Sequence, residues 1–375
     1  MTASWRSCPT RGQLEEGLPE EEETVKDTVK HKLPGDPGEG LTDWFERMSP
    51  FLQQQTRRQV EYKRKHWPDL PDGTWRSNPY PHILPEGSQE KAFFEPFLIP
   101  YMQAHDIAFH AESLNLRSSQ ACCLNFLYYL RQNLEQASEV LRGWFPELLR
   151  VTSIEFEYTG PEAATTWLGE PPGGKRGMNR TSVDAAIWWA DIHRKPRLTL
   201  VEWKYTEKGF GNCGGYVSKG NNSRDRCRTV DMRSISPKRD CYLVQGDTST
   251  TQRHYWDHMD DAGINYRVFQ EPGCPFRGPL YQLLRQQLLA HWLETNTDNR
   301  VDVAVACFRD NEDLMRSPSY LKHVHPDLPS AWGAFLAEPE RFQVLHVEDL
   351  MAHCDYVSSV ATSPWREYLR ERYKI

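Results

Sequence analysis

The sequence predicts an α/β fold preceded by a helical N-terminal extension. Helical apolar periodicity dominates the chain before residue 150. The segment 151–158 is β-branched and alternating, as in a strand. Two apolar runs, at 183–191 and 197–205, flank a short polar turn, which is typical of a β-hairpin. A chain of 375 residues with 38% hydrophobic residues can bury a sizeable core.

The chain begins with a predicted disordered acidic tail, residues 1–40, which is rich in Glu, Pro and Gly and almost lacks periodic apolar positions. Six glutamates and two arginines before residue 25 account for −4 of the formal net charge of −7. The remainder is nearly neutral, so the overall charge does not exclude a nucleic-acid partner.

The composition also predicts the compartment. The nine cysteines follow no regular secreted framework, which indicates a reducing environment. No apolar run is long enough to span a bilayer, and the N-terminal residues lack the order of a signal peptide. We therefore expect a cytoplasmic protein with no membrane contact.

The helical N-terminal extension is predicted over residues 41–117, and its first helix ends in a basic cluster at 57–65. Ser118 or Ser119 caps an apolar helix at 121–130. A second helix is expected at about 135–149, before the strand at 151–158.

The predicted hairpin carries the most informative polar residues. Because side chains two apart on a strand share a face, Glu202 and Lys204 point to one side, together with Leu198 and Leu200. A three-residue loop at 193–195 would place Asp184 directly opposite Lys204, with Glu202 diagonal to it. A turn one residue shorter would move Asp184 to the other face.

The rest of the chain contains a long polar segment and three further elements. Residues 207–276 form a predicted polar, basic insertion with little periodicity. A helix at 280–293 and buried strands at 301–308 and 342–347 follow. The domain predicted at 118–350 would thus be followed by a C-terminal helical segment at 351–375.

Asp184, Glu202 and Lys204 are the candidate catalytic residues. A Glu at the end of so apolar a strand needs a partner if it is buried. Two neighbouring carboxylates, Asp184 and Glu202, suit Mg²⁺ or Mn²⁺, which prefer oxygen ligands. Lys204 would then orient a metal-bound water or help to deprotonate it, and would offset charge on a phosphorus atom. This is an apparatus for phosphodiester hydrolysis.

The chain resembles the PD-(D/E)XK nuclease superfamily, and within it a bacterial restriction-endonuclease-like family. Asp184 is similar to the first acidic residue of that superfamily, and Glu202-Trp203-Lys204 to its (D/E)XK element; Val183 stands where the named pattern has proline. Further similar segments span residues 40–350 in order: Ser118–Ala121 with Asn125, Ile154–Tyr158, Thr181–Asp184, Val201–Glu207, and Leu280–Arg285 with Leu288–Ala290. The resemblance implies a restriction-endonuclease-like core with a central mixed sheet flanked by helices, a divalent metal, and DNA as substrate.

Accessory positions follow from the resemblance. Glu157 and Gln120 lie where the superfamily can carry a further metal-site residue, although either could be a core hydrogen-bonding group. Arg285 or Gln286 could contact the scissile phosphate. Within 219–239 the net charge is +5, so this segment is either the DNA-backbone contact or a solvated loop. The candidate DNA-binding residues there are Lys219, Arg224, Arg226, Arg228 and Arg233.

Two other interpretations remain open at this point. One is a non-catalytic nucleic-acid-binding or partner-binding protein that retains the nuclease fold. The other is a metal-stabilised insertion using Cys213, Cys227, Cys241 and Cys274, although no Cys-x-x-Cys pair is present. The leading expectation is a nuclease in restriction or defence, with DNA repair behind it. Cutting both strands commonly needs two active sites, which makes a homodimer plausible.

Overall fold

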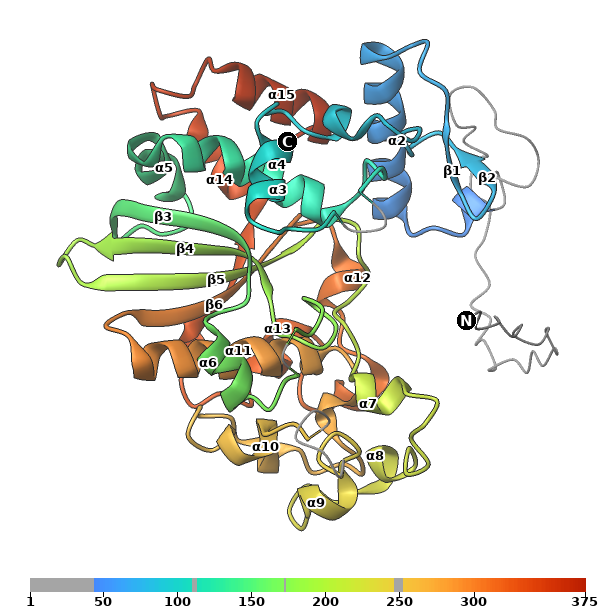
Figure 1. Cartoon of the computed structure of the whole chain (residues 1–375), viewed down its shortest axis with the longest axis vertical. Coiled ribbons are helices and arrows are strands. Elements are labelled where there is room, and N and C mark those ends of the chain that lie inside the picture. Colours follow the sequence, from blue (N-terminus) through green and yellow to red (C-terminus); the bar gives the residue numbers. More distant parts are fainter. Residues whose placement is uncertain (1–43, 110–112, 172, 246–251) are drawn as a thin grey trace, which may run out of the picture.

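The structure, a computed structural model, describes residues 44–109, 113–171, 173–245 and 252–375. The predicted acidic tail at 1–40 lies outside these residues. A five-stranded mixed sheet, in the order β3-β4-β5-β6-β7, forms the centre of the molecule, and helices cover both of its faces (Figure 1). This confirms the predicted fold class.

The sheet changes from antiparallel to parallel pairing at β5. β3 pairs with β4 and β4 with β5 in antiparallel fashion, whereas β5, β6 and β7 run parallel. The parallel pairs require long crossovers, and the one between β5 and β6 contains the whole insertion. The strands are β3 Leu148–Tyr158, β4 Val183–Asp191, β5 Pro196–Lys204, β6 Arg300–Cys307 and β7 Phe342–His346.

One face of the sheet is covered by helices from both ends of the chain. Val201 and Trp203 of β5 point to this face and share one hydrophobic cluster with these helices. The helices are α4 Ser119–Gln132, α5 Leu134–Leu141, α14 Val347–Cys354 and α15 Pro364–Tyr373. Ser118 caps α4 as predicted, because its hydroxyl accepts the N–H of Ala121. The helix predicted to reach residue 149 ends at Leu141 instead, since Leu148 already begins β3.

The opposite face carries α11, Leu280–Asn296, with α6, Glu162–Trp167, and α13, Leu328–Gly333 (Figure 1). Leu198 and Leu200 of β5 pack with the α11 residues Leu289 and Leu293 on this side. The even-numbered residues of β5 therefore share one face, as the strand periodicity predicted, and the structure shows that α11 covers this face.

The N-terminal extension is not purely helical. After α2, Pro50–His66, the chain forms a small hairpin, β1 Gly73–Trp75 and β2 Asn78–Tyr80, and then η1 Gln89–Ala92 and α3 Leu98–Ala104. The two residues between the strands, Arg76 and Ser77, both have positive φ angles, of 49° and 67°. Positive φ at both positions is characteristic of a type I′ turn. Arg-Ser is an uncommon sequence for that turn, which explains why the hairpin was not predicted.

The insertion is packed against the rest of the domain rather than being structureless. Phe210, Met232, Tyr255 and Phe269 are buried and share a hydrophobic cluster with Leu280 of α11. Its elements are α7 Gly214–Val217, α8 Arg226–Thr229, α9 Pro237–Asp240, α10 Tyr255–His258, η2 Tyr266–Val268 and η3 Pro275–Arg277. Such short helices produce little periodicity, so the sequence pattern did not show them. Three further short elements follow β6: α12 Glu312–Met315, η4 Ser319–Leu321 and η5 Pro339–Arg341.

Two further observations concern the described residues as a whole. None of their helices has the length and apolar character needed to cross a membrane. The eight cysteines among them are all free thiols.

Candidate active site

The turn of the β4–β5 hairpin sets the register of the candidate catalytic residues. The Asp191 carboxylate accepts the backbone N–H groups of His193 and Lys195, both at 2.9 Å, and Arg194 has a φ angle of 61°. The Asp191 N–H donates to the Lys195 carbonyl, so the three-residue loop is 192–194. This is one residue earlier than predicted.

The earlier loop moves the register by two residues. Ala185 pairs with Val201, so the next residues along the two strands, Asp184 and Glu202, lie beside each other. The predicted pairing of Asp184 with Lys204 was therefore wrong. Because a shift of two residues preserves the face, Asp184 stays on the same side as Glu202 and Lys204.

The third strand adds another carboxylate to this row. Phe156 pairs with Ala185 and Tyr158 with Val183, which places Glu157 of β3 beside Asp184. Glu157 is buried and has a φ angle of 49°. A non-glycine residue in this left-handed region costs about 1–3 kcal/mol, so the surrounding fold must hold it there.

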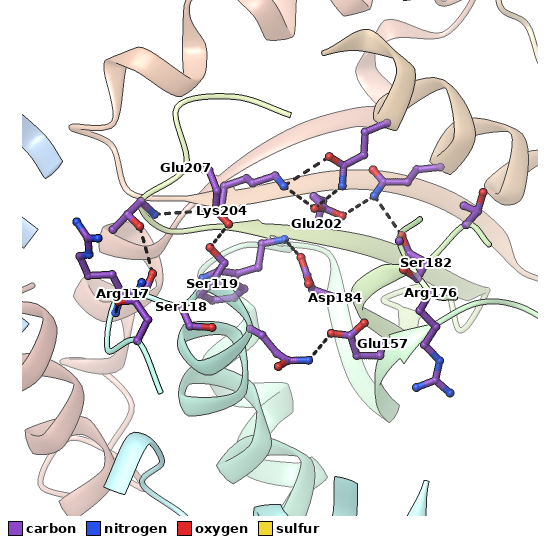
Figure 2. A pocket seen from close by; sticks show the side chains of 18 of the residues that line it. Arg117, Ser118, Ser119, Glu157, Arg176, Ser182, Asp184, Glu202, Lys204 and Glu207 are labelled. Atoms are coloured by element: carbon purple, nitrogen blue, oxygen red, sulfur yellow. Dashed lines mark hydrogen bonds and ion pairs between the residues drawn. The ribbon is translucent and has the colours of Figure 1, made fainter. Parts of the chain in front are cut away.

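The three carboxylates line one cavity of about 650 Å³ at this end of the sheet (Figure 2). Its walls come from the first turn of α4, the ends of β3 and β5, the start of β4, and α11. The predicted residues Gln120, Lys204, Arg285 and Gln286 line it as well. The structure thus gathers the three candidate catalytic residues and all four accessory residues around one space.

Glu202 is held by three donors. Lys204 Nζ lies 2.8 Å from Glu202 Oε1, and Gln282 Nε2 donates to the same oxygen at 2.6 Å. Gln286 Nε2 donates to Oε2 at 2.5 Å. Gln282 and Gln286 are one turn apart on α11, so this helix fixes both oxygens of the carboxylate.

Lys204 is buried beside carboxylates. Burial lowers its pKa, but the negative charges of Glu202, Glu207 and Asp184 raise it by more, so its net pKa lies above the usual value. The ammonium group therefore stays charged at neutral pH.

Asp184 is a carboxylate whose negative charge is disfavoured by its surroundings. Burial, and then the negative charges of Glu202 and Glu157, raise the pKa of Asp184 well above its usual value. Lys204 and the backbone N–H of Trp203, which donates to Asp184 Oδ2 at 2.6 Å, act in the opposite direction. Crowded acidic groups of this kind attract a cation or a proton.

Glu157 and Gln120 contact each other. Gln120 Nε2 donates to Glu157 Oε1 at 2.7 Å and also to the carbonyl of Ala108. The first turn of α4 therefore reaches the outer carboxylate of the row. Glu207 accepts the N–H groups of Tyr205 and Thr206 and the hydroxyl of Ser119, and so ties the end of β5 to α4.

Arg285 lies at the wall of the cavity but its guanidinium is engaged by the protein. It donates to Thr181 Oγ1 at 3.0 Å, to the carbonyl of Gly177 at 3.2 Å and to Glu170 Oε1 at 3.3 Å. These contacts join α11 to the segment that enters β4. A phosphate contact by Arg285 stays a prediction.

The basic residues of the insertion do not line this cavity. Several are paired locally: Arg233 with Asp231, Arg228 with Asp225, and Arg226 with Asp240. Figure 1 shows α8 and α9 at the far end of the molecule from α4. DNA binding by this segment stays a prediction.

Several residues of the cavity wall were not singled out from the sequence, among them Gln282, Arg117 and Arg176. Gln282 had a usable signal, because it precedes Gln286 by one helical turn on the polar stripe of an otherwise apolar helix. Arg117 and Arg176 lie in irregular segments, where periodicity gives no information.

Among the residues that the structure describes, no three His, Cys, Asp or Glu side chains are grouped as the ligands of one ion. Cys213, Cys241 and Cys274 line a small cavity of about 30 Å³ together with aromatic and aliphatic side chains and Arg253, and burial raises the pKa of Cys213 to about 12. At the sheet end, the oxygen donors and the raised pKa of Asp184 are compatible with a divalent cation, which would relieve the crowding of negative charge.

Comparison with known proteins identifies the family. The family model described as Restriction Endonuclease associating with ARP matches residues 55–374. The chain belongs to this family. The match begins within α2 and extends through α15, so it includes the whole five-stranded sheet, the carboxylates of the cavity and the insertion. Comparison with curated proteins and with solved structures finds no match.

Proposed function

We propose that the protein is a metal-dependent nuclease of the PD-(D/E)XK type that hydrolyses DNA phosphodiester bonds. The observation that carries the proposal is the arrangement of Asp184, Glu202 and Lys204 on adjacent strands around one cavity. The description of the family as a restriction endonuclease supports the same reaction.

Asp184 and Glu202 would hold Mg²⁺ or Mn²⁺, with Glu157 as a further acidic neighbour. The bound ion would act as a Lewis acid and lower the pKa of a water molecule. Asp184 must lose its proton to serve as a ligand. Gln282 and Gln286 would keep Glu202 in one orientation while this happens.

Lys204 acts in this proposal as a cation. Its raised pKa makes the neutral amine rare, so helping to deprotonate water is the less favourable of the two roles predicted for it. The charged group can orient the attacking water and stabilise negative charge that develops on the phosphate oxygens.

DNA is the proposed substrate because of the family description and because Arg117 and Arg176 contribute positive charge to the cavity wall. We further propose a role in restriction or defence within the cytoplasm. A homodimer would allow both strands to be cut. A non-catalytic DNA-binding role is less well supported, since binding alone does not require a buried Glu202–Lys204 pair beside a crowded aspartate.

The test is cleavage of plasmid and linear DNA by the full-length protein in Mg²⁺, Mn²⁺ or chelator. Asp184→Asn, Glu202→Gln and Lys204→Gln should each lower the cleavage rate by about 100-fold or more. Asp298→Asn and Lys208→Gln, which change the same residue types at exposed positions, should cleave like the wild type. Thermal unfolding of each variant controls for loss of the fold.

Binding of DNA by the wild type without cleavage in either metal would refute the nuclease proposal and favour the non-catalytic alternative. Cleavage that survives in all three site variants would show that the reaction takes place elsewhere in the protein.

A further inference from the structure

A second pocket, of about 200 Å³, lies next to the candidate active site. It is formed by the β1–β2 hairpin, by Trp44 before α2, and by the segment that leads to α4. Asn115 and Arg117 line both this pocket and the catalytic cavity, so the two spaces share a wall.

Aromatic side chains dominate the lining. Trp44 stacks on His82 with ring centroids 5.3 Å apart and planes 9° from parallel. Tyr80 meets Trp44 edge to face at 5.0 Å. Trp75 also lines the pocket and is 39% exposed, which is unusual for so large an apolar side chain. Flat, partly accessible rings of this kind offer surfaces for stacking.

A buried polar atom accompanies the rings. The His82 side chain is only 1% exposed, and its Nδ1 atom has no hydrogen-bond partner. Burial, followed by the positive charges of Arg117 and Lys63, lowers the pKa of His82 well below its usual value, so the ring is neutral. A neutral imidazole offers one donor and one acceptor, and a buried group of this kind left unpaired is costly.

The charge at the pocket narrows the class of ligand. The Arg117 guanidinium lies 5.6 Å from the centre of the Trp44 ring and already occupies a cation–π position there. A second cation, such as a methylated ammonium group, would be repelled. A neutral planar ring would stack on the aromatic faces, and its polar edge would hydrogen-bond to His82. An anionic phosphate linked to that ring would lie near Arg117.

We propose that this pocket binds one nucleobase of the DNA substrate, unpaired or extruded from the duplex, by stacking on the aromatic rings and hydrogen bonding to His82. The pocket volume suits a single heterocyclic base rather than a whole nucleotide. The attached backbone would pass Arg117 toward Asp184 and Glu202. This inference rests on the proposed function, because it concerns the same substrate.

The test measures the affinity of the protein for an oligonucleotide in the presence of a chelator, so that the result does not depend on metal-dependent hydrolysis. The full-length protein is titrated with a fluorescent oligonucleotide, in one arm single-stranded and in the other duplex. Trp75→Ala should weaken binding about 10-fold, because base–aromatic stacking is lost, and Trp75→Phe should restore most of it. Tyr356→Ala, which removes an aromatic residue 87% exposed just after α14, should have no effect.

Photo-cross-linking locates the base directly. Oligonucleotides that carry 5-iodouracil are irradiated with the protein, and the attachment site is mapped by mass spectrometry. Cross-links are expected at Trp75, Tyr80 or His82. Cross-linking of the single strand alone indicates an unpaired base, and cross-linking of both arms indicates extrusion from the duplex; either result supports the pocket.

The base pocket would be overturned if Trp75→Ala and His82→Phe bound the oligonucleotide as tightly as the wild type and all cross-links lay outside the pocket. Metal-dependent cleavage by the wild type would then still leave the nuclease proposal intact. Cross-links in the pocket without any metal-dependent cleavage would support the base pocket and refute the nuclease proposal. The two proposals therefore fail separately.

Discussion

Asp184 is an acidic residue in surroundings that favour its neutral form. The folded protein holds this proton at a pH where an unfolded aspartic acid, with a pKa of about 3.9, has lost it. The stability that this proton binding contributes is present below the unfolded pKa and is lost as the pH rises through the raised folded pKa. Charge at Asp184 therefore weakens the metal-free fold.

An asparagine at this position should remove that penalty. In chelator, we expect Asp184→Asn to unfold at a higher temperature than the wild type, by a margin that grows between about pH 5 and about pH 8. The amide oxygen can still accept the Trp203 N–H. Thermal unfolding at both pH values, with Asp298→Asn as the exposed control, provides the measurement. A margin independent of pH would contradict the assignment.

Glu157 shows strain in the backbone. Its positive φ angle lies within a strand whose pairing continues on either side, at Phe156 and Tyr158. Strained residues of this kind are found where the side chain must point in a particular direction. Here the Glu157 side chain meets Gln120.

At the scale of elements, α11 joins the site to the insertion. The Arg285–Glu170 pair has side-chain exposures of 7% and 1%, and Glu170 also accepts the hydroxyl of Tyr255 in the insertion. Removing one partner of a buried pair leaves an uncompensated charge.

We expect Arg285→Ala to lower the free energy of unfolding by about 3–5 kcal/mol. Arg267→Ala breaks a pair with Asp260 whose exposures are 50% and 65%, and should cost about 1 kcal/mol or less. Urea denaturation of the two variants gives the comparison. Equal losses would show that burial does not decide the strength of the pair.

The β4–β5 hairpin shows what strand periodicity can and cannot determine. The alternation in 197–205 correctly placed Glu202 and Lys204 on one face, because that face depends only on the period of a strand. The register depended on hydrogen bonds from the turn to the Asp191 side chain, which no periodic pattern contains. The predicted register was wrong by two residues, which keeps Asp184 on the same face as Glu202 and Lys204.

At the scale of the whole molecule, segments distant in the sequence share one interior. Arg372 of α15 is fully buried and donates to Gln59 of α2 and to the carbonyls of Ala92 and Leu116. Gln59 in turn donates to the hydroxyl of Tyr205, just beyond β5. Contacts between residues 313 positions apart, such as Arg372 and Gln59, could not be predicted without an explicit fold.

The path of DNA over the surface belongs to this scale too. If the backbone crosses the mouth of the cavity, Arg176→Ala should weaken binding regardless of sequence and reduce the slope of log affinity against log salt by about 1. Arg228→Ala, on the insertion, should then change little. Titrations between about 50 and 200 mM salt distinguish the two. A larger effect at Arg228 would place the DNA over the insertion.

The two α11 glutamines that donate to Glu202 have a consequence for the pH dependence of the activity. Amides neither gain nor lose protons in the physiological range, so their hold on this carboxylate is the same in acid and in base. Any change that pH makes to the activity must therefore enter through other groups, such as the carboxyl groups, the proposed metal-bound water or the substrate. Gln282 and Gln286, which do not titrate, hold Glu202 in place beside Asp184, which does.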